Sequence, residues 1–375
     1  MPKLTFQKSE IEKFLSMISY ISLTPDTIKF SPIMEYILLN IKNGYCTLTA
    51  TSNSSYIKYM FACENADSSI LVNYTKLSKF YSEKRKDTLT ITYSETDSKV
   101  ILSDGLSTIQ YSNAIEAILL NFPPQPILRG IKFTNLSSLV IKQLNVSKKF
   151  VLPEKRDSLR PFLNHSMIKD NHILASDNFI SFFYELPEYF EYNAISDKEI
   201  SFINNFENVE YSKLDNWSII KHKTIIFGNK LKENLDCGFV FEAITRAISF
   251  LDKTKYMKID SDQLYSFCKS VKSYAIDLTV NCYLEIQNEY VNMTYDDILN
   301  DIHFNTKVDC ISVGYENGYK IALSWEKIQL ALDGIESKYI NISEVTGTNY
   351  FGFWLENDSN FNAICTKGSI IQQNG

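Results

Sequence analysis

The chain has 375 residues, 45% of them hydrophobic and 13% aromatic, which is enough to build the cores of two or three domains. Gly and Pro are sparse, at 12 and 9 residues, and this composition excludes a fibrous or disordered protein. The net charge of −6 gives no global sign of nucleic-acid binding, although the distribution of charge over the fold decides that question.

The seven cysteines predict buried free thiols. None forms a CxxC pair and their number is odd, so a reducing cytosol is a better expectation than a disulfide framework. No apolar run reaches membrane-spanning length. The first residues, MPKLTFQKSEIEKF, carry charges where a signal peptide needs an apolar stretch. We therefore expect a cytoplasmic protein with no membrane partner.

The first predicted unit begins with a strand and an amphipathic helix at residues 3–21. Two strands around the turn KNG follow within 34–53. Residues 71–93, LVNYTKLSKFYSEKRKDTLTITY, then predict a short strand, a helix capped by Asn73 and an alternating strand. The Pro-rich stretch NFPPQP at 121–126 predicts a rigid connector after this unit.

The same order of elements recurs twice along the chain. A strand and an amphipathic helix are predicted again at 131–150 and 256–275. Strand pairs with the turns KDN and QNE follow within 162–178 and 279–297. The repeated order indicates three units of the same design.

The strand–helix–strand pattern of 71–93 also recurs, at 194–214 and 321–345. The predicted helix caps follow one another at intervals of roughly 125 residues, the length of a domain rather than of a solenoid repeat: Asn73, Ser196 and Ser324. The sequence therefore predicts an α+β protein of three repeated domains, each a doubled βαβββ unit with two helices on antiparallel sheets. Their expected boundaries are 1–124, 125–250 and 251–375.

Three doubled units in this length resemble the bacterial DNA polymerase III beta subunit, the sliding clamp. LRPFLNHSMIKDNHILASDNFISFF, at 159–183, is similar to the family segment in which an Arg-Pro-x-Leu hairpin runs into a Thr-Asp-Gly-His-Arg-Leu turn. NFPPQP and GFVFEAI (238–244) resemble the exits from the first and second domains, and NGYCTLTATSN (43–53) resembles a first-domain hairpin. The ordered set covers nearly the whole chain and is more specific than any one motif.

The resemblance implies the DNA clamp fold, in which helices line the hole of a ring and sheets form its outside. It implies a processivity factor that encircles double-stranded DNA, without sequence preference, as a homodimeric ring. Its implied partners are a DNA polymerase and a clamp loader, both bound through short linear peptides. It implies a protein with no catalysis of its own, and the residue patterns give no reason to expect a metal or a cofactor. In the sequence itself, GxxxxGK[ST], GxGxxG and GxSxG motifs are absent.

Basic residues on the predicted helices are the candidates for DNA contact. A sliding ring needs cations that face phosphates diffusely rather than side chains that read bases. A single Lys on a polar helix face is usually only solvated, so the shared location on repeated helices is the informative observation. The predicted DNA-binding residues are Lys8, Lys13, Lys76, Lys79, Lys84, Arg85, Lys86, Lys142, Lys148, Lys149, Lys198, Lys269, Lys272 and Lys327.

By resemblance, a pocket for partner peptides lies between the second and third domains. The residues implied for its lining, listed below, suit an apolar groove that accepts one or two hydrophobic side chains of an extended peptide. Ordinary packing between domains explains the same residues equally well, and the sequence leaves both readings open. The implied lining is Leu163, Ser176, Asn178, Phe179, Val240, Ile244 and Cys365.

The pocket motif departs from the family pattern. The family turn is replaced by Ser176-Asp177-Asn178-Phe179-Ile180-Ser181, which lacks the small residue and both basic groups. The chain end NAICTKGSIIQQNG is polar and runs past the short apolar tail of the family. These departures favour a distant member, encoded by a phage or a plasmid. They also favour an alternative, a clamp-fold scaffold that no longer encircles DNA and binds replication partners. An enzyme is a third alternative, but the sequence shows no convergent polar residues for it.

Overall fold

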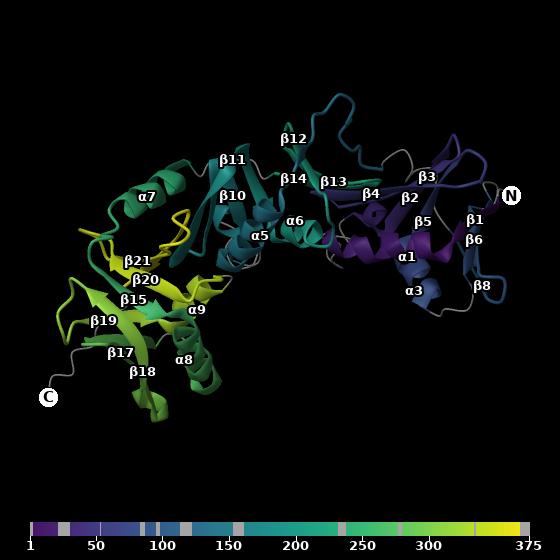
Figure 1. Ribbon diagram of the computed structural model, residues 1–375. Coiled ribbons are helices and arrows are strands. Elements are labelled where there is room, and N and C mark those ends of the chain that lie inside the picture. Colours follow the sequence, from purple (N-terminus) through teal and green to yellow (C-terminus); the bar gives the residue numbers. More distant parts are fainter. Residues whose placement is uncertain are drawn as a thin grey trace. The chain divides into compact units, whose positions relative to one another are not determined.

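The computed structural model describes residues 3–21, 31–52, 54–82, 87–94, 98–112, 122–152, 161–231, 238–276, 280–333 and 335–367 (Figure 1). The chain forms two compact units. Unit 1 comprises Met1–Ser137 and Lys198–Glu233, and unit 2 comprises Ser138–Asp197 and Asn234–Gly375. The middle third of the chain is therefore shared between the units, and the three expected domain boundaries stay a prediction.

Unit 1 contains two antiparallel sheets, with strand orders β1-β6-β7-β8 and β5-β2-β3-β4-β14-β13-β12-β9. Its strands are β1 (Lys3–Gln7), β2 (Tyr36–Lys42), β3 (Tyr45–Thr51), β4 (Ser55–Ala62), β5 (Ser68–Asn73), β6 (Thr88–Ser94), β7 (Lys99–Ser103), β8 (Thr108–Ser112), β9 (Thr134–Asn135), β12 (Glu210–Leu214), β13 (Trp217–His222) and β14 (Ile225–Lys230). Its helices are α1 (Lys8–Met17), α3 (Tyr74–Ser82) and α6 (Asp197–Ile203), whose first residue belongs to unit 2.

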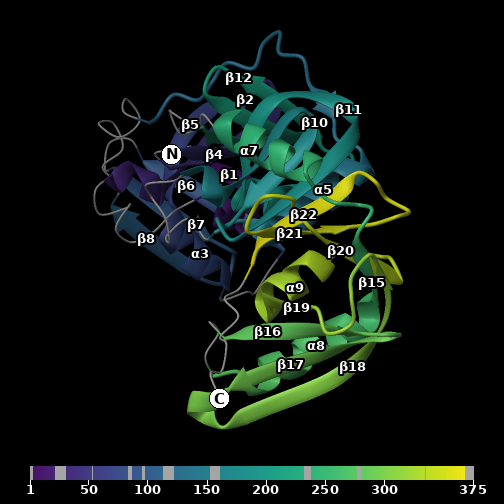
Figure 2. The ribbon, with the colours of Figure 1, turned by 90° about the vertical axis from the view of Figure 1, so that its left-hand side faces the viewer.

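Unit 2 contains one antiparallel sheet, with the order β10-β11-β22-β21-β20-β15-β18-β17-β16-β19 (Figure 2). Its strands are β10 (His165–Ser176), β11 (Ile180–Ser196), β15 (Tyr256–Asp260), β16 (Asn281–Gln287), β17 (Tyr290–Asp297), β18 (Ile302–Val313), β19 (Lys320–Ser324), β20 (Tyr339–Glu344), β21 (Tyr350–Trp354) and β22 (Phe361–Thr366). Its helices are α5 (Ser138–Ser147), α7 (Gly238–Ser249), α8 (Ser261–Tyr274) and α9 (Trp325–Leu332).

Short 3-10 helices flank several of these elements: η1 (Ile18–Tyr20), η2 (Pro32–Glu35), η3 (Lys148–Phe150), η4 (Pro161–Asn164) and η5 (Ile298–Asn300). The secondary structure and the antiparallel sheets confirm the predicted α+β class.

The three predicted helix starts are confirmed. The helices α3, α6 and α9 begin directly after Asn73, Ser196 and Ser324. The Asn73 carboxamide oxygen accepts the backbone N–H of Lys76 at 3.0 Å, which satisfies one of the amide donors exposed at a helix start. Ser324 occupies the same position but makes no such side-chain bond. Each helix then buries apolar side chains, from Leu77 on α3 to the stripe of Trp325 and Ile328 on α9.

The predicted turns KNG and QNE lie between β2 and β3 and between β16 and β17. Asn43 and Gly44 both have positive φ, 54° and 79°, as a tight hairpin turn requires. The turn predicted at KDN coincides with shifts in register between β10 and β11, and Asp170 at its centre has φ 56°. The real turn between β10 and β11 is formed by Asp177, Asn178 and Phe179.

The same kind of strand pairing joins neighbouring repeats. The strand β14, the last of the second repeat, pairs with β4 of the first repeat, which places Gly228 opposite Tyr56. The strand β22, the last of the third repeat, pairs with β11 of the second repeat, which places Cys365 opposite Ile180. We call these two pairings the repeat joints.

The helix α7 was not expected, because GFVFEAI resembled a domain exit. It buries Val240, Phe241 and Ile244 in a cluster with Met167 and Phe183 of the β10 and β11 strands. This burial supplies a packing energy that local sequence does not display.

Within the described residues, no helix is both long enough and apolar enough to cross a membrane.

Candidate functional sites

The predicted basic residues lie on several helices. In unit 1 they are Lys8 and Lys13 on α1, Lys76 and Lys79 on α3, and Lys198 on α6. In unit 2 they are Lys142 on α5, Lys148 and Lys149 on η3, Lys269 and Lys272 on α8, and Lys327 on α9. Figure 1 shows α8 and α9 side by side in unit 2. Lys84, Arg85 and Lys86 lie outside the described residues.

Aromatic rings order several lysines of unit 1. The ammonium of Lys76 lies 4.4 Å from the centroid of the Tyr111 ring, and that of Lys8 lies 5.0 Å from the Tyr81 ring. Lys13 lies in the same way over Tyr59, at 4.9 Å. A ring face attracts a cation without neutralising its charge, so these lysines remain able to face an anion.

The lysines of α5 and η3 differ, because carboxylates neutralise them. The Nζ atom of Lys142 lies 3.0 Å from Glu336 Oε2, and that of Lys149 lies 3.2 Å from Asp333 Oδ2. We call these two contacts the α5 ion pairs. Lys148 makes a similar contact with Asp197 at 2.9 Å. A cavity of about 330 Å³ lies beside the first pair, lined by both of its residues and by Tyr184.

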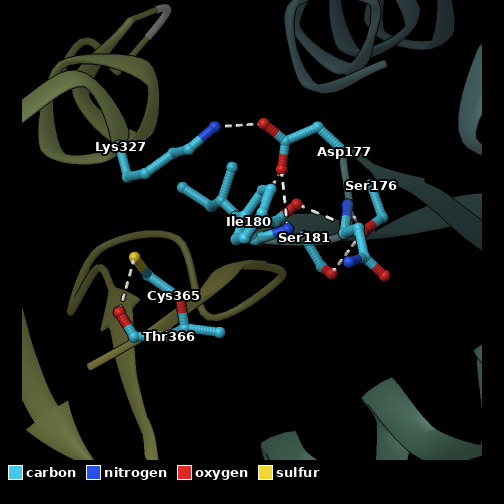
Figure 3. Close-up of polar contacts among 9 residues, drawn as sticks. Ser176, Asp177, Ile180, Ser181, Lys327, Cys365 and Thr366 are labelled. Atoms are coloured by element: carbon cyan, nitrogen blue, oxygen red, sulfur yellow. Dashed lines mark hydrogen bonds and ion pairs between the residues drawn. The ribbon is translucent and has the colours of Figure 1, made fainter. Parts of the chain in front are cut away.

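The turn between β10 and β11 is fixed by its own polar side chains (Figure 3). Asp177 Oδ1 accepts the backbone N–H groups of Phe179 and Ile180, both at 2.9 Å. The Ser176 hydroxyl donates to the Ile180 carbonyl and accepts the amide of Asn178. Asn178 has φ 80°, a conformation that favours Gly and that Asn tolerates better than most residues. The turn therefore forms without glycine.

Lys327 contacts this turn from α9 (Figure 3). Its ammonium forms an ion pair with Asp177 Oδ2, and the two side chains are only 16% and 11% exposed. The same ammonium lies 5.7 Å from the centroid of the Phe179 ring. Phe179 itself is 59% exposed. Lys327, which the sequence grouped with the DNA-facing lysines, thus has its charge directed at the turn.

The residues implied for a peptide pocket separate into a buried and an exposed group. Leu163, Val240, Ile244 and Cys365 are buried, and Ser176 is buried beside them in the turn. Asn178 and Phe179 are exposed. Val240 and Ile244 belong to the core cluster that joins α7 to β10 and β11. The exposed part of the set is therefore the tip of the turn.

Cys365 lies on β22 directly beneath this turn. Burial raises the pKa of its thiol to about 12. The thiol donates to the carbonyl of Thr366 at 3.4 Å. A protonated, buried thiol is a packing group rather than a nucleophile. Among the described residues, no group of three or more His, Cys, Asp or Glu side chains is arranged to hold a metal ion.

Sequence reasoning missed two exposed apolar features at strand edges. Ile109 lies exposed on the edge strand β8 of unit 1. In unit 2, Ile298 and Leu299 lie in η5 between β17 and β18, where Leu299 is 91% exposed. The signal was present in DDILND (296–301), an apolar pair inside an otherwise polar turn. Exposed apolar side chains beside a strand edge are typical of an interaction surface.

Comparisons with known proteins reveal the fold. No family model and no curated protein matches the sequence. Solved structures match over the whole chain. The DNA polymerase sliding clamp from Caulobacter crescentus has a TM-score of 0.82 at 13% identity, covering 99% of this chain and 100% of its own. The DNA polymerase III beta chain from Streptococcus pneumoniae has a TM-score of 0.79 at 16% identity, with the same coverage.

A third match is the sliding clamp from Bartonella birtlesii bound to griselimycin, with a TM-score of 0.81 at 14% identity. It covers 99% of this chain and 100% of its own. The identities are low, so the agreement is one of backbone arrangement. The chain has the fold of the bacterial DNA polymerase III beta sliding clamps.

Proposed function

We propose that this protein is a sliding-clamp-like processivity factor, which closes as a homodimeric ring around duplex DNA and tethers a DNA polymerase. The observation that carries the proposal is the repeat joint. It occurs twice within the chain, and the strands for a third joint each have a side with no partner among the described strands.

The free strands occupy matching positions in the repeats. The strand β8 is the last of the first repeat, as β14 and β22 are of the second and third. It pairs with β7 and with no other described strand. Residues 302–309 of β18, the counterpart of β4, pair with β17 alone among the described strands. Pairing of β8 with β18 of a second copy repeats the joint, and a head-to-tail contact of this kind closes after two copies.

The lysines of α1, α3, α6 and α8 are proposed to face the duplex. Cations held on ordered helices bind phosphates without reading sequence, and diffuse contacts of this kind permit sliding. The net charge of −6 does not oppose this role, because it is the local field in the hole that the DNA experiences.

Partner peptides of the polymerase and of a clamp loader are proposed to dock beside the exposed tip of the 176–181 turn. Phe179 offers an exposed aromatic face, and the ion pair of Lys327 with Asp177 keeps the turn in place. The alternative is a clamp-fold scaffold that binds replication partners without encircling DNA. The α5 ion pairs favour it, because they neutralise lysines that a DNA-binding surface would use.

Light scattering and retention on circular DNA test the proposal. We expect a mass near twice 43.2 kDa. The protein is first placed on nicked circular duplex DNA, either by a clamp loader or by opening the ring under mild conditions. We expect the complex to survive gel filtration and to be lost after the circle is linearised. A monomer, or binding that ignores circularity and disappears with salt, rejects the ring and supports the scaffold.

A further inference from the structure

Two carboxylates in the segment after α9 form ion pairs with two lysines that lie seven residues apart in the sequence, one on α5 and one on η3. Glu336 lies against Lys142 and Asp333 against Lys149. Both carboxylates follow Leu332, the last residue of α9. The two contacts therefore connect the segment after α9, in the third repeat, to α5 and η3 of the second repeat. The charges of the four groups cancel.

These contacts are open to water. The side chains of Lys142 and Glu336 are 46% and 81% exposed, and those of Lys149 and Asp333 are 40% and 29% exposed. Ion pairs at such exposure are weak, because water already solvates both ions. DNA can therefore replace the carboxylates, because its backbone carries closely spaced phosphates and releases condensed counterions when lysines bind them. The displaced carboxylates would remain near the phosphates and repel them.

We infer that Asp333 and Glu336 limit the affinity of this protein for DNA, by competing with backbone phosphates for Lys149 and Lys142. The inference rests on the proposed function, and it extends the DNA-facing surface from α1, α3, α6 and α8 to α5 and η3. It adds a restraint to that surface. A protein that must slide gains from weak contacts, and each lysine kept on a carboxylate is one phosphate contact fewer.

The test is the double variant Asp333→Asn/Glu336→Gln, measured by fluorescence anisotropy on a short labelled linear duplex over a range of salt concentrations. We expect an affinity gain of about three- to tenfold at low salt, because two cations are released and two anions removed. The slope of log Kobs against log salt should steepen by about 0.9 for each lysine that reaches a phosphate.

A matched control changes the net charge equally at strand positions. Glu210 pairs with Lys221 at 2.6 Å and Glu285 with Lys320 at 3.1 Å. The double variant Glu210→Gln/Glu285→Gln therefore also frees two lysines and removes two negative charges. An equal gain in affinity and slope with this control would show a net-charge effect and overturn the inference.

The lysines supply the second arm. Lys142→Gln/Lys149→Gln should lower the affinity of the wild-type protein little, yet abolish the whole gain in the Asp333→Asn/Glu336→Gln background. Equal losses in both backgrounds overturn the inference, as does absence of detectable binding by the carboxylate variant. A linear duplex requires no closed ring, so loss of retention on circles rejects the ring without changing this result.

Discussion

Asp177 performs two tasks within the 176–181 turn. Its Oδ1 atom accepts two backbone N–H groups, and its Oδ2 atom receives the ammonium of Lys327. Both ions are nearly buried, so the loss of either leaves the other without a counter-charge in a site that water reaches poorly. The position of the turn tip, including Phe179, depends on this one carboxylate.

Replacing Asp177 by Ala is expected to lower the free energy of unfolding by about 2–4 kcal/mol, because it leaves the Lys327 ammonium without its counter-charge and two backbone amides without their acceptor. Asp177→Asn retains an acceptor for the amides and should cost about half as much. Urea denaturation measures both. If Asp177→Asn cost nothing, the buried ion pair with Lys327 would contribute nothing to stability.

At the residue scale, contacts between residues close in the sequence could be predicted, and contacts between residues far apart in the sequence could not. Helical spacing places Lys327 on the polar face of α9, and from sequence it looked like other exposed lysines. Its partner Asp177 lies 150 residues earlier, so no local pattern reports the pair. The family resemblance did locate the turn itself, and its Ser, Asp and Asn side chains bond to their own backbone as these residue types commonly do in turns.

Among the elements, the helix starts were predictable and α7 was not. Asn73, Ser196 and Ser324 are residue types favoured at the N-cap, and each directly precedes its helix. The helix α7 depends instead on apolar contacts with strands from another part of the chain. The repeat joints were also beyond sequence reasoning, because the local pattern of a strand does not indicate which strand it pairs with.

The joint between β14 and β4 contains a steric requirement. A Cβ atom added at Gly228 would lie 2.2 Å from the ring of Tyr56, which is fully buried. Gly228→Ala should therefore lower the free energy of unfolding by about 1–3 kcal/mol. Tyr56→Leu removes the ring and should make the same Gly-to-Ala change nearly neutral in the double variant. Additive losses, read from chemical denaturation, would show that the ring is not the obstacle.

At the scale of the whole molecule, a substitution on the edge strand β8 tests whether two copies of the chain associate through this strand. Ile109→Lys puts a charge on an already exposed position at this edge, so the monomer should keep its stability while the pairing surface is blocked. We expect light scattering to shift from a mass near twice 43.2 kDa to a mass near 43.2 kDa.

Ile127 provides the control for that shift, because it is 82% exposed and lies outside every strand of the structure. Ile127→Lys should leave the mass unchanged. A dimer that survives Ile109→Lys would mean that copies associate through another surface.

The repeat joint has a kinetic consequence for the proposed ring. Two copies meet at two identical joints, and formation of the first makes closure of the second an intramolecular event. The effective concentration of the second pair of edges is then set by the chain geometry and not by the amount of protein in solution. A single opened joint would therefore reclose far faster than the two copies separate. A loader then needs to hold only one of the two joints open while DNA enters the ring.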